Sequence, residues 1–168
     1  MPMAVPRQHK EHAPVSVKCG VVTCSDSRNP ETDDSGKLIK DLLLQAGHTV
    51  LFYAVVKDEP KAIADAVEQA SWTCDAIITN GGTGVARRDV TIPTLTPQFE
   101  RTLPGFGELF RGLSYEAIGS AAWLSGAAAG VYHGRIVFSL PGSPEACRLA
   151  MEKLILPELP HVVGVMNR

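Results

Sequence analysis

The segment DAIITNGGTG, residues 75–84, joins a short apolar run to a loop that contains three glycines. Residues 75–79 have the length and the apolar, β-branched composition of a buried strand. The polar and glycine-rich residues 80–84 follow directly and end that strand in a loop. A strand that is apolar along nearly its whole length is typical of a parallel sheet covered by helices on both faces.

The residues before this segment show the same alternation of strand and helix. Strands are predicted at residues 15–23 and 49–56, because both stretches are dense in apolar and β-branched residues. Residues 33–47 begin with three possible cap residues, continue with apolar positions at helical spacing and end on a glycine, which predicts a helix. A second helix is predicted from Pro60 to about Ala70, with the proline in its first turn.

The C-terminal half is predicted to be less regular. Helices are expected at residues 93–101 and 108–118. The alanine-rich segment 121–129 indicates close packing, within the chain rather than between subunits, while its secondary structure stays open. Trp72 and Trp123 are interpreted as packing residues.

A hairpin and a last helix complete the predicted elements. His133 and Gly134 separate the apolar residues 131–132 and 135–140, which is typical of a tight turn between two antiparallel strands. A helix is predicted from Ser143-Pro144 to about Leu156, and Pro157 and Pro160 are expected to interrupt the chain beyond it.

These elements predict an α/β protein, a three-layer α/β sandwich with a mostly parallel sheet and one antiparallel pair. Residues 15–168 are expected to form one domain, because a chain of 168 residues buries roughly 70% of its unfolded surface around a single core. Residues 1–14, rich in proline, histidine and charge, are expected to be a flexible N-terminal arm.

Composition excludes several classes of protein. The formal net charge of −2 gives no general attraction for polyanions, so nucleic acid is not an expected partner. No segment is long and apolar enough to span a membrane, and no signal peptide precedes the first strand, so we expect a cytoplasmic protein without a membrane partner. The cysteines, Cys19, Cys24, Cys74 and Cys147, form no zinc-type pair and are interpreted as buried thiols in a reducing compartment.

Four loops that follow predicted strands or the hairpin carry most of the polar chemistry. They are residues 25–28, 57–59, 80–89 and 141–143. Ligands of doubly wound sheets bind beyond the carboxyl ends of the strands, so function is expected at these loops. Their hydroxyls, carboxylates and glycines suit phosphate and a metal ion.

The strongest motif is NGGTGVARRD, residues 80–89. Its glycines allow positive φ angles, and successive backbone N–H groups can then point at one anion. The alternative, a mobile turn, stays open at this point. The motif matches neither G-x-x-x-x-G-K-[ST] nor G-x-G-x-x-G, which disfavours a P-loop kinase and a Rossmann dehydrogenase.

Asp58 and Asp89 end loops on the same rim of the sheet, where two carboxylates can hold Mg²⁺ against nucleotide phosphates. Each also has a structural alternative. Asp58 can cap the helix that begins at Pro60, and Asp89 can form a turn. Ser25 and Asp26 can belong to a local cap cluster, and Ser143 can simply cap its own helix.

These motifs, in this order, resemble the MoaB/MogA family of molybdenum-cofactor biosynthesis proteins, over nearly all of residues 15–160. The resemblance rests on Ser25-Asp26, TDDSG at 32–36, GGTG at 81–84, RRDVT at 87–91, PGFGE at 104–108, Ser114 and LPGSP at 140–144. The chain differs at Ser143, because PGNP is common in relatives where this chain has PGSP.

The resemblance implies a molybdopterin-binding fold that assembles as a trimer or hexamer, with other cofactor-assembly proteins as candidate partners. It implies adenylylation of molybdopterin by Mg²⁺ and ATP with release of pyrophosphate. Carried over by position, Asp58 and Asp89 become catalytic residues and metal ligands. The substrate-binding residues implied are Ser25, Asp26, Gly81, Gly82, Thr83, Gly84, Ser114, Pro141, Gly142 and Ser143. The alternative is a non-catalytic carrier of molybdopterin, as in the MoaB branch.

Overall fold

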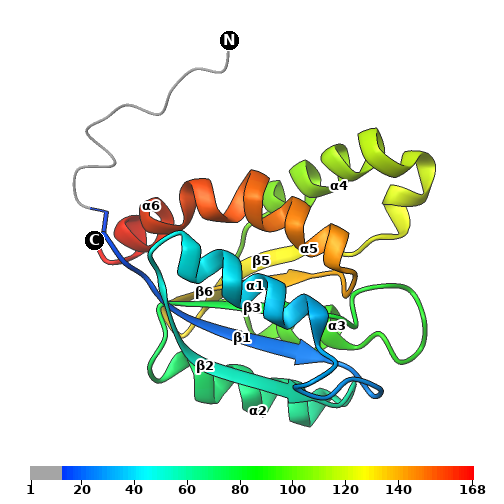
Figure 1. Ribbon diagram of the computed structural model, residues 1–168, viewed down its shortest axis with the longest axis horizontal. Helices are drawn as coiled ribbons and strands as arrows, with labels where there is room; N and C mark the ends of the chain where they lie inside the picture. Colours follow the sequence, from blue (N-terminus) through cyan, green and yellow to red (C-terminus); the bar gives the residue numbers. More distant parts are fainter. Residues whose placement is uncertain (1–12) are drawn as a thin grey trace.

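A computed structural model describes residues 13–168 and contains one six-stranded sheet with helices on both faces (Figure 1). The strand order is β2-β1-β3-β6-β5-β4. The strands are β1 (Lys18–Cys24), β2 (Thr49–Val56), β3 (Ala76–Asn80), β4 (Arg101–Thr102), β5 (Ala128–Tyr132) and β6 (Arg135–Leu140). The predicted N-terminal arm, residues 1–14, lies almost wholly outside the described residues.

The sheet is mostly parallel, as predicted. β2, β1, β3 and β6 pair in parallel, and β5 and β6 form the predicted antiparallel hairpin. His133 and Gly134 both have positive φ, 46° and 72°, which is the backbone conformation that a two-residue turn requires. The two-residue strand β4 adds a further antiparallel pairing on the outer side of β5.

The helices form the two outer layers of the sandwich. α2 (Pro60–Ser71) and α3 (Thr91–Leu95) cover one face, and α1 (Asp34–Gln45), α4 (Pro104–Ile118), α5 (Pro144–Ala150) and α6 (Leu156–Met166) cover the other (Figure 1). Each face of the sheet buries its own apolar cluster. Ile39, Leu43 and Phe110 belong to the cluster under α1 and α4, whereas Ile63 and Val67 belong to the cluster under α2.

The predicted helix at residues 93–101 is wrong in extent. α3 ends at Leu95, a 3₁₀ turn occupies Thr96–Gln98, and Arg101 pairs with Val131 as part of β4. The proline in that turn, Pro97, ends the regular hydrogen bonding and lets the chain extend. α4 in turn begins at Pro104 rather than at residue 108, because a proline suits the first helical position.

The chain stays helical through Pro157 and Pro160, so the prediction that these residues interrupt it is wrong. The π-helical turn Met151–Ile155 joins α5 to α6, and Pro157 lies in the first turn of α6. Pro160 stands inside the helix, where its missing N–H removes one helical hydrogen bond. Leu159 is fully buried, so packing against the sheet favours the continuous helix.

The alanine-rich segment is partly a 3₁₀ turn, Gly119–Leu124, and partly β5. Ala122, Ala127 and Ala129 are buried, which confirms close packing within the chain. The two tryptophans are not packing residues, because Trp72 is 70% exposed and Trp123 is 74% exposed. Within residues 13–168, no helix has the length and apolar character needed to cross a membrane.

Candidate functional site

The carboxyl ends of β1 and β3 meet where the connections leave the sheet in opposite directions, the position at which doubly wound sheets bind ligands. A polar hollow of about 90 Å³ opens there. Of the predicted site residues, it is lined by Ser25, Gly81 and Gly142. The Ser25 hydroxyl accepts hydrogen bonds from the N–H groups of Ser27 and Arg28, so it also shapes its own loop.

In the glycine loop that follows β3, the first residue, Gly81, is held by hydrogen bonds, whereas the N–H groups of the next four residues are not held by any described residue. Gly81 has a φ of +93°, and a Cβ at this position would collide with the carbonyl oxygen of Cys24, so only glycine fits. The Gly81 N–H donates to Leu140 O at 3.0 Å, and Thr91 Oγ1 donates to Gly81 O at 2.9 Å. The next four N–H groups, residues 82–85, donate to no acceptor within residues 13–168. These amides are available to an anion.

The loop at residues 141–143 is held beside the glycine loop. Ser35 Oγ, in the first turn of α1, donates to Gly142 O at 2.7 Å. A Cβ at Gly142 would lie 3.3 Å from Gly81 Cα, so the two loops touch. Ser143 Oγ accepts from the Ala146 N–H at 3.2 Å, which confirms the cap that the sequence left open for this residue.

A larger cavity, of about 270 Å³, lies between α4 and α5 and brings together Ser114, Pro141 and Ser143. Ser114 is 5% exposed, and its hydroxyl makes no hydrogen bond within residues 13–168. The remaining wall is largely apolar. It consists of Phe110, Ala117, Ile118, Ser125, Glu145, Ala146 and Leu149. This combination of apolar wall and few polar groups is typical of a small-molecule site.

Asp26 and Asp58 form a reciprocal pair. The Asp26 N–H donates to Asp58 Oδ2 at 3.1 Å, and the Asp58 N–H donates to Asp26 Oδ1 at 3.0 Å. The N-cap of α2 is Glu59, so Asp58 is not the cap of that helix and its structural alternative is wrong. Asp58 Oδ1 is buried and has no hydrogen-bond partner among residues 13–168.

The second carboxylate, Asp89, lies close enough to Asp58 for their charges to interact. Burial raises the pKa of Asp58, and the negative charges of Asp26 and Asp89 raise it further. Asp89 Oδ2 accepts from the Ala86 N–H at 2.9 Å and lies against Gly84, so Asp89 does form the turn that its structural alternative described.

The acidic residues suit a divalent cation that is shared with a substrate. No group of three or more His, Cys, Asp or Glu side chains within residues 13–168 forms a complete metal site. Mg²⁺ is commonly held by one or two carboxylates together with water and substrate phosphates, so the incomplete set at Asp58 and Asp89 fits this ion. The orphaned Asp58 Oδ1 supplies a free ligand atom.

Thr83, a predicted substrate residue, lines neither of these hollows. It is 8% exposed and packs against Gly126, where a Cβ would collide with Thr83 O. The predicted residues therefore form three neighbouring groups. Ser114, Pro141 and Ser143 line the cavity, Ser25, Gly81 and Gly142 line the polar hollow, and Asp26, Asp58 and Asp89 cluster beside Gly82 and Gly84.

The sequence analysis missed a buried network beneath the polar hollow. Asp33 Oδ2 accepts from Thr23 Oγ1 and from the Tyr53 hydroxyl, both at 2.6 Å, and Asn80 Nδ2 donates to Thr23 Oγ1 at 2.9 Å. Asp33, Thr23 and Asn80 are each at most 3% exposed. The only signal in the sequence was Asp33 as a helix cap, which it also is, since it accepts from the Gly36 N–H.

Comparison with known proteins agrees with this architecture. Residues 20–161 match the family model described as a probable molybdopterin binding domain. Molybdenum cofactor biosynthesis protein B of Bacillus subtilis is 54% identical over 165 residues, which cover 96% of this chain and 97% of that protein.

The chain is also similar to solved structures of molybdenum and tungsten cofactor biosynthesis proteins. The tungsten cofactor synthesizing protein MoaB from Pyrococcus furiosus is 36% identical, with a TM-score of 0.85 over 93% of this chain and 100% of that one. A structure of MogA is 27% identical, with a TM-score of 0.77 over 89% of this chain and 99% of that one. The chain therefore belongs to the MoaB/MogA family of molybdenum cofactor biosynthesis proteins, which is built on the molybdopterin-binding fold.

Proposed function

We propose that this protein transfers AMP from Mg-ATP to molybdopterin, giving adenylyl-molybdopterin and pyrophosphate. The observation that carries the proposal is Asp58 Oδ1, a buried carboxylate oxygen without a partner beside the glycine loop. An unpaired buried oxygen of this kind destabilises the free protein by about 1–3 kcal/mol. A bound cation satisfies that oxygen, which is why the arrangement suits metal-assisted nucleotide chemistry.

In this reaction the terminal phosphate oxygen of molybdopterin attacks the α-phosphorus of ATP. A new P–O bond forms to the adenylyl group, and the bond to pyrophosphate breaks. A phosphate monoester is largely ionised at neutral pH, so the attacking oxygen needs no strong base. Catalysis then depends on holding the two substrates in line and neutralising their charge, and Mg²⁺ supplies part of that neutralisation.

Different groups of residues bind the phosphates, the pterin and the cation. The free amides of residues 82–85 and the Ser25 hydroxyl hold phosphate oxygens, and Ser114 and Ser143 contact the pterin in the cavity between α4 and α5. Asp58 and Asp89 hold the cation and the nucleotide. Asp26 contacts the substrate and also holds Asp58 in position through their paired hydrogen bonds.

Substitution of Asp89 tests this assignment. Asp89→Asn keeps an oxygen for the Ala86 N–H but removes the charge, so we expect adenylyl transfer to fall below detection while pterin affinity stays within about twofold. Product is measured by mass spectrometry with purified protein, molybdopterin, Mg²⁺ and ATP. Glu59→Gln, which removes the exposed charge next to Asp58 in the sequence, is the control and keeps full activity. An active Asp89→Asn variant would contradict the assignment.

One observation favours a second function, that of a molybdopterin carrier without nucleotide chemistry. Asp89 Oδ2 is engaged in a local turn, as a purely structural residue would be. In that case the wild-type protein binds molybdopterin tightly but forms no product with Mg-ATP. The same mass-spectrometric assay therefore separates the two functions.

We further propose that the protein is a homo-oligomer, a trimer or hexamer, in the cytoplasm, where other cofactor-assembly proteins are its partners. The end of α4 and the following 3₁₀ turn project beyond the sheet (Figure 1). Large apolar side chains are exposed along α4 and this turn, which favours an interface. These are Leu109, Tyr115, Ile118, Trp123 and Leu124. The four free, buried thiols suit a reducing compartment. Light scattering coupled to size-exclusion chromatography measures the oligomeric state directly.

A further inference from the structure

The cavity between α4 and α5 contains one ionisable side chain. Its wall is formed by apolar residues, by Ser114, Ser125 and Ser143, and by a single carboxylate, Glu145 in the first turn of α5. Neither the sequence motifs nor the proposed function uses Glu145. A carboxylate is a strong acceptor with two oxygens and no donor, so its presence in this wall selects ligands that offer N–H groups.

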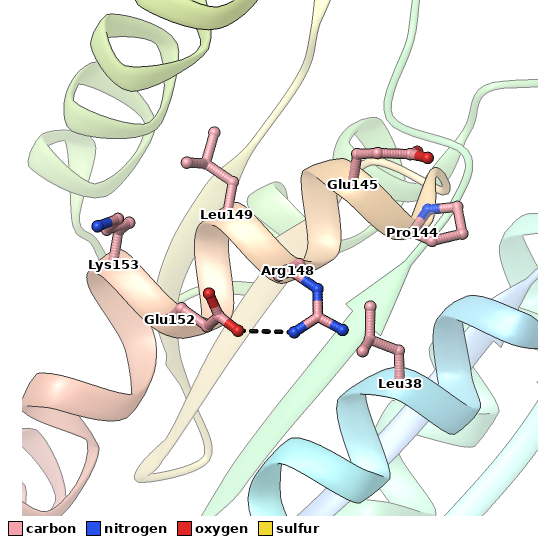
Figure 2. A pocket seen from close by; sticks show the side chains of 7 residues that line it. All are labelled: Leu38, Pro144, Glu145, Arg148, Leu149, Glu152 and Lys153. Carbon is pink, nitrogen blue, oxygen red and sulfur yellow. Dashed lines mark hydrogen bonds and ion pairs between the residues drawn. The ribbon is translucent and has the colours of Figure 1, made fainter.

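Glu145 is not neutralised by the cations around it. The neighbouring cation on α5, Arg148, points toward α1 and pairs with Glu152 at 2.7 Å (Figure 2). Glu145 makes no ion pair or side-chain hydrogen bond within residues 13–168, and Figure 2 shows its carboxyl group away from the Arg148 guanidinium. Its two oxygens are therefore available to a ligand.

The groove on the other side of α5 has a different character. It has a volume of about 470 Å³ and also includes Glu145, but its remaining polar lining is the Arg148–Glu152 pair and Lys153, and it contains none of the predicted site residues (Figure 2). Glu145 and Leu149 are the residues that line both hollows. Of the two, only the cavity between α4 and α5 combines Glu145 with Ser114 and Ser143.

A pterin presents the matching chemistry. Its 2-amino-4-oxopyrimidine ring carries two adjacent donors, the 2-amino group and the N3–H, on one edge. The two oxygens of a carboxylate can accept both hydrogens in parallel, and such charge-assisted pairs are stronger than neutral ones. Glu145 is exposed, so a ligand that lacks one donor still binds, but it loses one of the two charge-assisted hydrogen bonds and binds more weakly.

We propose that Glu145 is the residue that recognises the 2-amino and N3–H edge of the pterin ring and so determines the selectivity of the cavity. This inference rests on the proposed function, since it takes the occupant of the cavity to be a pterin. Ser114 and Ser143 lie in the same wall and contact the rest of the ligand. The apolar residues Phe110, Ile118 and Leu149 cover the faces of the ring.

The test compares two soluble probes, 6-hydroxymethylpterin and 6-hydroxymethyllumazine, which has an oxygen in place of the 2-amino group. Binding to the full chain is measured by fluorescence titration. We expect the wild-type protein to bind the pterin at least about tenfold more tightly than the lumazine, which is the discrimination one charge-assisted hydrogen bond gives. Glu145→Gln, which loses the charge and keeps the shape, should reduce that preference to about twofold or less.

The control variant is Glu116→Gln, an exposed residue of α4 that lines neither hollow. It should keep the wild-type preference. Because α5 begins near Glu145, the thermal midpoint of each variant is measured as well; a loss of helix stability lowers that midpoint but leaves the ratio of the two affinities unchanged.

The outcomes separate this inference from the proposed function. Equal preference in the wild-type protein and Glu145→Gln overturns the role of Glu145 while pterin binding stands. Failure of the wild-type protein to bind either probe overturns the assignment of this cavity to a pterin ring, whereas AMP transfer is decided separately by the mass-spectrometric assay with molybdopterin, Mg²⁺ and ATP. GMP carries the same edge on a purine, and tighter binding of GMP than of the pterin assigns the cavity to a guanine nucleotide and overturns the proposal.

Discussion

At the scale of single residues, the ionised Asp58 side chain destabilises the folded protein in the absence of a ligand. Asp58 has one buried oxygen without a partner and lies near two other carboxylates. Its folded pKa is raised above the ordinary value of 3.8. Protonated Asp58 therefore contributes stability that is fully present below pH 3.8 and is lost as the pH rises through the folded pKa. Ionised Asp58 destabilises the free protein at neutral pH.

Neutralising this residue should therefore stabilise the protein. Asp58→Asn keeps an oxygen for the Asp26 N–H and removes the repulsion, and we expect the midpoint of thermal unfolding at neutral pH to rise by roughly 1–3 °C. Calorimetry with and without Mg²⁺ provides the measurement. Glu59→Gln, a neighbouring exposed charge, should leave the midpoint within about 1 °C. A lower midpoint for Asp58→Asn would show that its charge is stabilising.

At the scale of elements, Asp33 joins four of them. Its carboxylate caps α1, accepts from Thr23 in β1 and Tyr53 in β2, and through Thr23 connects to Asn80 at the end of β3. Thr23, Asp33 and Asn80 line the polar hollow, so this network joins the carboxyl ends of β1 and β3 at the hollow. Replacing it affects both the stability of the sheet edge and the shape of the hollow.

Asp33→Ala should lower the free energy of unfolding by about 3 kcal/mol or more, because the buried Thr23 hydroxyl and the half-buried Tyr53 hydroxyl lose their acceptor and α1 loses its cap. Urea denaturation measures the change. The matched control is Asp34→Ala, since Asp34 is adjacent but exposed. It is expected to cost less than about 1 kcal/mol, and a similar loss in both variants would contradict the role of the network.

The elements show where sequence patterns suffice. The parallel strands, α1, α2 and the hairpin were predicted because apolar periodicity, Pro60 and the His133-Gly134 turn are local signals. The predicted interruption at Pro157 and Pro160 was wrong because helix continuity there depends on the π-helical turn and on packing of Leu159 against the sheet. β4 was missed because two residues carry no period, and only pairing with β5 defines them.

The candidate site could be predicted from the sequence only in part. Ser114 and Ser143 lie far apart in sequence, and their meeting in one cavity followed from the family resemblance rather than from any local pattern. Thr23 and Asn80 carried no signal, because each looks like an ordinary strand residue until Asp33 is placed beside it. Trp123 lies in the 3₁₀ turn that follows α4, and its exposure depends on the tertiary arrangement, which no local pattern contains.

At the scale of the whole molecule, stability should depend on pH through His48. The buried His48 Nδ1 accepts from the Val17 N–H at 3.1 Å and so fixes the entry of the chain into the sheet. Burial lowers the pKa of His48 below 6.5. The unfolded chain binds this proton more readily than the folded one, so the stabilisation is present above pH 6.5 and is lost as the pH falls below it.

The wild-type protein should accordingly lose more stability between about pH 7.5 and about pH 5.5 than His48→Asn, which keeps an acceptor that does not titrate. Urea midpoints at the two pH values give the comparison. His133→Asn is the control, because His133 is exposed and asparagine tolerates its positive φ. An unchanged pH dependence in His48→Asn would exclude His48 as the responsible group.

The most direct test of the proposed reaction tracks the α- and γ-phosphorus atoms of ATP. The wild-type protein is incubated with molybdopterin, Mg²⁺ and ATP labelled at either the α- or the γ-phosphorus, and the pterin fraction is separated. Adenylyl transfer predicts that the α label enters the pterin fraction and that the γ label leaves in pyrophosphate. Absence of label from the pterin, or entry of the γ label, would contradict the account.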